Sequence, residues 1–132
     1  MKEKMNNQTV VVLGASNKPH RYSYKAIKLL KEYGHNIIPV HPKLTNIDGL
    51  PVIANLSDIH ETVDTLTLYI GADNSQFLID EIIALKPERV IFNPGTKSEL
   101  LEDKLLQAEI LFIHDCTLIM LESDQFEFPL TH

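Results

Sequence analysis

Short apolar runs alternate along this chain with segments of helical periodicity, and this alternation constrains the fold more than any other feature. The runs fall at residues 8–13, 36–40, 65–70, 89–92 and 109–113. Helical spacing of apolar residues is found in three segments. The first is residues 22–33, and the second can be capped by Asp73 or Asn74 and ends before Pro87. The third follows the capping-box spacing of Thr96 and Glu99. A run that is apolar on both faces is typical of a strand buried in a parallel sheet. The alternation therefore predicts five parallel strands with helices on both faces.

One domain accounts for the whole chain. The 132 residues include 44% hydrophobic and 23% charged side chains, which suffices for one core and no second one. We predict a single Rossmann-type α/β/α domain over residues 1–132, with a five-stranded parallel sheet in the order 3-2-1-4-5. Residues 1–7 and 125–132 are expected to be peripheral tails, and residues 43–60 to be a connection with a turn signal at Asp48-Gly49.

The composition excludes several classes of protein and of site. No apolar run approaches the ~20 residues that a membrane helix needs, and the first residues lack the apolar stretch of a signal peptide. The single cysteine, Cys116, excludes a disulfide framework, and no spacing of ligand residues favours a metal site. The sequence indicates a soluble, cytoplasmic protein that does not bind a membrane.

Charge is distributed unevenly along the chain. The formal net charge of −6 argues against a general nucleic-acid-binding surface. Residues 1–45 nevertheless carry eight basic and two acidic groups, a net +6, whereas the remaining residues carry four basic and sixteen acidic groups, a net −12. Two interpretations stay open: a solvated helix face with Lys25, Lys28 and Lys31, and a site for a phosphate-rich small molecule with Lys18, Arg21 and Lys43.

The turn after the first predicted strand has the residues of a phosphate site. In an open parallel sheet the ligand crevice lies beyond the carboxyl ends of the strands. Gly14 allows a tight turn there, and the amides of residues 14–16, the Ser16 hydroxyl and the start of the next helix can face phosphate oxygens. Arg21 adds a guanidinium fork. The turn is neither G-x-G-x-x-G nor a Walker loop, because only the first glycine is present and no Gly-Lys-Ser/Thr follows.

The end of the second predicted strand discriminates between nucleotides. An NAD site usually has Asp or Glu there to accept hydrogen bonds from the ribose hydroxyls. This strand instead ends with V-H-P-K at residues 40–43, with no acid before Asp48. A cation at that place favours a phosphorylated ribose, as in NADP or coenzyme A (CoA). Lys43 can also be an ordinary exposed lysine; if it binds phosphate, Lys18, Arg21 and Lys43 should converge on one crevice.

Together these motifs resemble the small stand-alone CoA-binding proteins, which share a CoA-binding Rossmann domain with the α-subunit of succinyl-CoA synthetase. The resemblance covers residues 8–122 and rests on V-L-G-A-S at residues 12–16, on R-Y-S-Y-K at residues 21–25, and on V-H-P-K, which is similar to the family's V-N-P-K. It implies CoA or an acyl-CoA as ligand, with the diphosphate at residues 14–16, the adenosine and its 3′-phosphate near Pro42 and Lys43, and the pantetheine arm passing residues 93–95. The candidate binding residues are Gly14, Ala15, Ser16, Arg21, Tyr22, His41, Pro42, Lys43, Asn93 and Gly95.

The chain departs from the family pattern at four places. Ser23 stands where the family commonly has glycine, and His41 replaces the usual asparagine. Residues 93–96 read N-P-G-T rather than Q-x-G, and the late D-R-C motif reads H-D-C at residues 114–116, without its arginine. The adenosine diphosphate end of the site is therefore better supported than the pantetheine end.

No catalytic residue is predicted. The six histidines lie in no catalytic pattern, and these residues include neither the phosphohistidine domain nor the nucleotide-grasp partner of a ligase of the succinyl-CoA type. His20 and His41 are interpreted as polar partners of phosphates. Cys116 is either a small buried residue or, at the crevice end, a thiol able to form a mixed disulfide with CoA. Tyr22 and Tyr69 are core-edge residues or adenine neighbours.

The main hypothesis is a module that binds CoA or an acyl-CoA without catalysis of its own. The enzymatic alternative is a minimal NADP-dependent oxidoreductase, which the missing glycines and the lack of a substrate domain disfavour. A nucleotide-sensing regulatory module is the third hypothesis, and the net charge of −6 disfavours direct contact with nucleic acid in that role. A protein partner or a homo-oligomer stays open.

Overall fold

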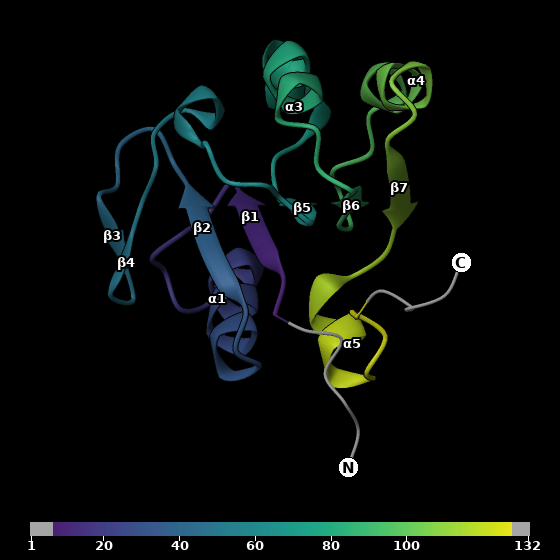
Figure 1. Cartoon of the computed structure of the whole chain (residues 1–132). Helices are drawn as coiled ribbons and strands as arrows, with labels where there is room; N and C mark the ends of the chain where they lie inside the picture. The colour runs from purple at the N-terminus through teal and green to yellow at the C-terminus, as the bar shows by residue number, and fades with distance from the viewer. Residues whose placement is uncertain (1–6, 128–132) are drawn as a thin grey trace.

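The five predicted apolar runs form one parallel sheet with helices on both of its faces (Figure 1). The computed structural model describes residues 7–127. The elements are β1 (Thr9–Leu13), α1 (Tyr22–Glu32), β2 (Asn36–Val40), β3 (Asn46–Ile47), β4 (Leu50–Pro51), the 3-10 helix η1 (Leu56–Asp58), β5 (Thr65–Leu68), α2 (Ala72–Ser75), the 3-10 helix η2 (Gln76–Leu78), α3 (Ile79–Leu85), β6 (Arg89–Phe92), α4 (Glu99–Gln107), β7 (Leu111–His114) and α5 (Thr117–Glu122). The predicted Rossmann-type α/β/α fold with five parallel strands is confirmed.

The predicted order of the strands is wrong. The sheet runs β2-β1-β5-β6-β7, which is 2-1-3-4-5 when its five strands are numbered along the chain, and not 3-2-1-4-5. β5 pairs with β1, from Val10↔Thr65 to Leu13↔Leu68, instead of lying outside β2. All four residues of β5 are buried, which suits a strand with a neighbour on each side.

β2 is consequently an edge strand, and the connection that follows it covers that edge. The carbonyl of Pro39 accepts a hydrogen bond of 2.9 Å from the amide of Ile53, and the amide of His41 donates to the carbonyl of Ile53 at 3.1 Å. β3 and β4 form a small antiparallel hairpin just before this segment. Proline is tolerated on an edge strand because no ladder partner there requires its missing N–H.

The core has two layers, one on each face of the sheet. Figure 1 shows α3 and α4 on one side and α1 and α5 on the other. The first layer includes Leu66, Leu68, Val90, Phe92, Ile82, Leu101 and Leu105. The second includes Val10, Val12, Ile91, Ile27, Leu30, Met120 and Leu121. α1 has 11 residues, and no helix in the described part of the chain is long and apolar enough to cross a bilayer.

Two helix starts differ from the predicted ones. Ser98, not Thr96, caps α4, and its Oγ accepts a hydrogen bond of 3.2 Å from a backbone amide of the first turn. Gly71, rather than Asp73 or Asn74, precedes the second helical segment, which consists of α2, η2 and α3 in succession. α5 has no counterpart among the predicted helices, because its six residues are too few to show a helical period.

Two of the three lysines expected on a solvated helix face hold the β3–β4 turn. Lys31 Nζ lies 3.0 Å from Asp48 Oδ2, and Lys28 Nζ lies 3.6 Å from the same oxygen. The hydrogen bond from Lys31, aided by the charge of Lys28, lowers the pKa of the Asp48 carboxyl. Lys25 lies over the ring of Tyr22, 5.3 Å from its centroid. These contacts account for part of the positive charge in the first third of the chain.

Residues 125–127 pack beneath the sheet, near the amino ends of its strands. Phe126, in a segment expected to be a peripheral tail, is 2% exposed, and the guanidinium of Arg89 lies 4.7 Å from its ring centroid. The carbonyl of Phe126 accepts hydrogen bonds from the side chains of Arg89 and Gln8. Burial lowers the pKa of Arg89 to about 10. Residues 1–6 and 128–132, which make up most of the predicted tails, lie outside the described residues.

The change Phe126→Ala should lower the free energy of unfolding by about 3–5 kcal/mol, because it removes a buried ring together with its contact to Arg89. The matched control is Phe77→Ala, at a ring that is 77% exposed, which should change that free energy by less than about 0.5 kcal/mol. Urea denaturation followed by circular dichroism measures both. Equal effects of the two changes would show that residues 125–127 are not part of the core.

Candidate functional site

The carboxyl ends of β1, β2 and β5 meet at a crevice of about 820 Å³. Its lining comes from four segments: the turn after β1, the loop after β2, the connection before η1, and the chain after β5. Six of the ten predicted binding residues line it, namely Gly14, Ala15, Ser16, Arg21, His41 and Pro42. The structure therefore brings together the two motifs that the sequence analysis singled out.

No Asp or Glu among the described residues lines this crevice, although the chain contains 18 acidic residues. Lys18 and Arg21 do line it. Lys43 is exposed at the rim, between Pro42 and Leu44, which are both part of the lining. None of these three cations forms an ion pair with a described residue. Two of the three cations expected to converge thus line one crevice, and the third flanks it.

The turn at Gly14 joins the ends of three strands. Gly14 has φ +91°, and a Cβ there would lie 2.7 Å from Ile70 Cγ2 and 3.1 Å from the backbone carbon of Tyr69. The amides of Gly14 and Ala15 both donate to the carbonyl of Val40, at 3.3 and 3.2 Å. Two of the amides that the sequence analysis assigned to phosphate are therefore already bonded to β2.

The residues after this turn retain unused hydrogen-bond donors. The amides of Ser16 and Asn17 donate to no described residue, whereas Ser16 Oγ accepts from the amide of Lys18 at 3.0 Å. α1 starts after Arg21 with no side-chain cap and no acid in its first turn. Ser23, within that turn, is 5% exposed and does not line the crevice. Free amides and a positive helix end next to two cations form a site suited to an anion.

Asn93 and Gly95 lie at a neighbouring hollow of about 290 Å³ beyond β6 and β7. Asn93 is 3% exposed. Its Nδ2 donates to Thr67 Oγ1 at 2.7 Å and to the carbonyl of Leu68 at 2.9 Å, and its Oδ1 accepts from the amide of Thr117 at 2.9 Å. The side chain of Asn93 therefore joins β5, β6 and α5, and Gly95 is the more accessible of the two residues.

Cys116 lines the same hollow as a free, partly buried thiol. The nearby His114 Nε2 lies 2.9 Å from Glu102 Oε2, which Lys97 also contacts at 3.1 Å, and the His114 ring stacks on Phe92. No hydrogen bond joins His114 to Cys116, and no histidine among residues 7–127 is bonded to the thiol. Within residues 7–127 no group of three or more His, Cys, Asp or Glu side chains is arranged to hold a metal ion.

Tyr69 lines the crevice, but Tyr22 and His20 do not. The Tyr69 hydroxyl is buried and makes no hydrogen bond of ordinary geometry with a described residue. Burial raises the pKa of Tyr69 to about 12, and the neighbouring hydroxyls of Thr117 and Thr67 offset part of that effect. The Tyr69 ring packs on the core layer of α1 and α5, so this residue belongs both to the core edge and to the crevice.

Crevice residues that the sequence-based prediction did not assign to the site include Leu44, Ala54, Asn55, Asn74, Phe77 and Leu78. The first three lie on the connection after β2 and the other three on α2 and η2, so their positions over the sheet depend on the strand order. Phe77 could have been identified from the sequence as a candidate binding residue, because it is a large aromatic on the polar side of a helical pattern. It is 77% exposed in the structure.

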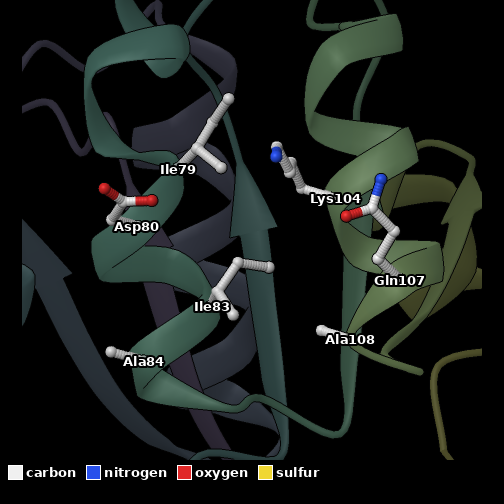
Figure 2. A pocket seen from close by; sticks show the side chains of 7 residues that line it. All are labelled: Ile79, Asp80, Ile83, Ala84, Lys104, Gln107 and Ala108. Carbon is white, nitrogen blue, oxygen red and sulfur yellow. The ribbon is translucent and has the colours of Figure 1, made fainter.

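A separate hollow of about 390 Å³ lies between α3 and α4 (Figure 2). Figure 2 shows Ile79 and Ile83 of α3 facing Lys104 of α4 across it. None of the predicted binding residues lines this hollow, and the acidic residue Asp80 is part of its lining. A phosphorylated ligand therefore suits it less than the crevice.

Comparison with known proteins identifies the family. Residues 8–122 match the family described as CoA binding domain. The chain belongs to this CoA-binding domain family. The match includes the turn after β1 and the loop after β2, and it confirms the resemblance that those motifs indicated.

Solved structures share the fold of this family member over most of its length. An uncharacterised protein with a crystal structure is 40% identical, with a TM-score of 0.86 over 92% of this chain and 99% of that one. Cell-free ID.343 from Thermus thermophilus is 28% identical, with a TM-score of 0.83 over 91% of both chains. The dinucleotide-forming acetyl-coenzyme A synthetase 1 of Ca. Korarchaeum cryptofilum, at 20% identity and a TM-score of 0.70, shares the fold over 83% of this chain and 26% of its own.

Among curated proteins, the uncharacterised protein YneT of Bacillus subtilis (strain 168) is 23% identical over 77 residues. That alignment spans 58% of this chain and 57% of YneT.

The raised pKa of Tyr69 leads to a prediction about stability at high pH. Below pH 10 the phenol is neutral in both folded and unfolded chains, whereas between pH 10 and about 12 only the unfolded chain ionises it. Relative to Tyr69→Phe, the wild type should therefore lose about 1.4 kcal/mol of unfolding free energy per pH unit in that interval. Ultraviolet titration of tyrosinate should show that Tyr69→Phe removes the highest transition. Loss of a transition near pH 10 instead would mean that the hydroxyl is solvated.

Proposed function

We propose that this protein binds coenzyme A or an acyl-CoA in the crevice at the carboxyl ends of β1, β2 and β5, without catalysing a reaction of its own. The electrostatic character of the crevice is the observation that carries this proposal. Two cations and the uncapped start of α1 surround a space that no described carboxylate lines, in a chain with a net charge of −6. CoA carries its negative charge on a diphosphate and a 3′-phosphate, which are complementary to that surface.

In this proposal the diphosphate lies against Ser16 and the first turn of α1, with Lys18 and Arg21 as counter-charges. The unused amides of residues 16 and 17 support this position, because phosphate oxygens accept hydrogen bonds from such groups. Gly14 and Ala15 shape the turn beneath the diphosphate.

The adenosine end lies at the loop after β2, next to Pro42. Lys43 stands at the rim of the same loop and contacts the 3′-phosphate, which it can reach because no described acid engages its ammonium group. The pantetheine arm leaves the crevice towards Gly95 and the hollow that Cys116 lines.

The groups in the crevice favour binding over catalysis. General acid–base chemistry needs a positioned proton donor or acceptor with a pKa near the operating pH. The crevice offers the His41 ring, whose Nδ1 already accepts two backbone hydrogen bonds, and the Tyr69 phenol, whose pKa of about 12 keeps it neutral. Neither has a carboxylate partner among the described lining residues.

Isothermal titration calorimetry with CoA, acetyl-CoA, dephospho-CoA and NADPH tests the proposal. We expect heat of binding and a rise in melting temperature with CoA and acetyl-CoA, and weaker binding of NADPH, whose phosphate is on the 2′ oxygen. The absence of heat and of a melting shift with CoA at high micromolar concentration would contradict the proposal. Displacement of CoA by a lower concentration of NADPH would favour the oxidoreductase alternative instead.

The change Lys43→Glu should raise the Kd for CoA about tenfold and leave the Kd for dephospho-CoA within about twofold, because only CoA has the 3′-phosphate. Lys104→Glu is the control, since it makes the same charge reversal on α4, outside the crevice. It should affect both ligands equally and weakly. An equal loss of both ligands in Lys43→Glu would refute the assignment of the 3′-phosphate to Lys43.

A further inference from the structure

The ring of His41 caps the loop that follows β2. His41 Nδ1 accepts hydrogen bonds from the amides of Lys43 and Leu44, each at 3.0 Å. The backbone amide of His41 itself donates to the carbonyl of Ile53 at 3.1 Å, which fixes the start of the loop to the neighbouring segment. The conformation of residues 41–44 therefore depends on one acceptor atom of one side chain.

These two hydrogen bonds also determine where the ring carries its hydrogen. An Nδ1 that accepts from two N–H groups has no hydrogen, so the neutral ring is protonated at Nε2. His41 lines the crevice, and its Nε2–H donates to no described residue. One edge of the ring thus holds the loop, and the Nε2–H on the other edge has no described partner.

We propose that His41 is a positioning residue for the phosphorylated ligand: Nδ1 holds residues 41–44 so that Lys43 stands at the rim, and Nε2–H donates to a phosphate oxygen. This inference rests on the proposed function for its ligand, whereas the cap itself is a property of the free protein. The role differs from that of a general base, because Nδ1 is engaged by two backbone amides and the ring transfers no proton.

The chemistry of the loop explains why histidine works where the family commonly has asparagine. Nδ1 of histidine and Oδ1 of asparagine are both bonded directly to Cγ, so each acceptor lies the same number of bonds from the backbone. Asparagine and aspartate commonly accept from the amide two residues later in just this way. His41 supplies that acceptor and adds a donor on the far side of the ring.

Four substitutions separate the two parts of the proposal. His41→Asn keeps an acceptor at the same place, and His41→Gln moves it one bond further from the backbone. His41→Leu removes it. His41→Asp keeps the acceptor but puts a negative charge into a crevice that no described carboxylate lines.

Amide hydrogen exchange of Lys43 and Leu44 in the ligand-free protein tests the cap. Exchange should accelerate about tenfold in His41→Leu and in His41→Gln, and should return to within about threefold of wild type in His41→Asn and His41→Asp. Nitrogen-15 spectra of the ring should show the tautomer protonated at Nε2. Unchanged exchange in His41→Leu, or a ring protonated at Nδ1, would overturn the cap.

Binding of CoA tests the positioning role. The Kd should rise about tenfold in His41→Leu, about threefold in His41→Asn, which keeps the acceptor but lacks the donor of the ring, and by more than tenfold in His41→Asp even though the loop is intact there. The losses should be smaller for dephospho-CoA. Normal CoA affinity in both His41→Leu and His41→Asp would overturn the positioning role.

The two experiments also distinguish this inference from the proposed function. If wild type does not bind CoA, the proposed function and the ligand contact of His41 both fail, while hydrogen exchange still reports on the cap. If His41→Leu does not fold, the comparison of His41→Asn with wild type decides the ligand contact, because that variant keeps the acceptor of the cap and lacks the Nε2–H donor. Equal Kd values for CoA in the two proteins would then overturn the contact.

Discussion

The close approach of three strand ends at Gly14 is the contact on which the site depends. The turn after β1 passes so near the end of β5 that a Cβ would lie 2.7 Å from Ile70 Cγ2. Two amides of the turn bond the last carbonyl of β2, at Val40. β1 is thereby held between its neighbours at the point where the crevice opens. Strand packing alone requires this glycine, and the amides without a described partner belong to the residues that follow the turn.

The basic side chains near the start of the chain lie in two different environments. Lys28 and Lys31 neutralise Asp48 at the β3–β4 turn, so they belong to the fold. Lys18 and Arg21 line the crevice with no acid beside them in the described structure. Cations without counter-charges repel one another, and an anion that enters between them relieves that repulsion. Both interpretations of the charge asymmetry therefore have physical support, each for different side chains.

Sequence reasoning located the sheet and the crevice, but it did not establish the strand order. Apolar runs reveal the strands because a strand buried on both faces is apolar along its whole length. The crevice could be located because parallel strands bring their carboxyl ends to one edge of the sheet. The order depends on long-range pairing, which no local pattern encodes. Pro39 was the local signal for the observed order, since proline favours an edge strand and the predicted order made β2 internal. Asn93 was placed correctly after β6, but its bonds to β5 and α5 could not be foreseen because α5 showed no helical period.

The two ends of the crevice differ in what they can recognise. The end that we propose for the adenosine diphosphate has free amides and cations, which suit charged oxygens. At the other end the Asn93 amide is fully engaged within the protein, and the adjoining hollow of about 290 Å³ is small. The pantetheine arm of CoA has no charge, so it offers this end little electrostatic attraction. A ligand held mainly by its phosphates leaves its thiol end weakly constrained, and we therefore expect this crevice to accept CoA with different acyl groups.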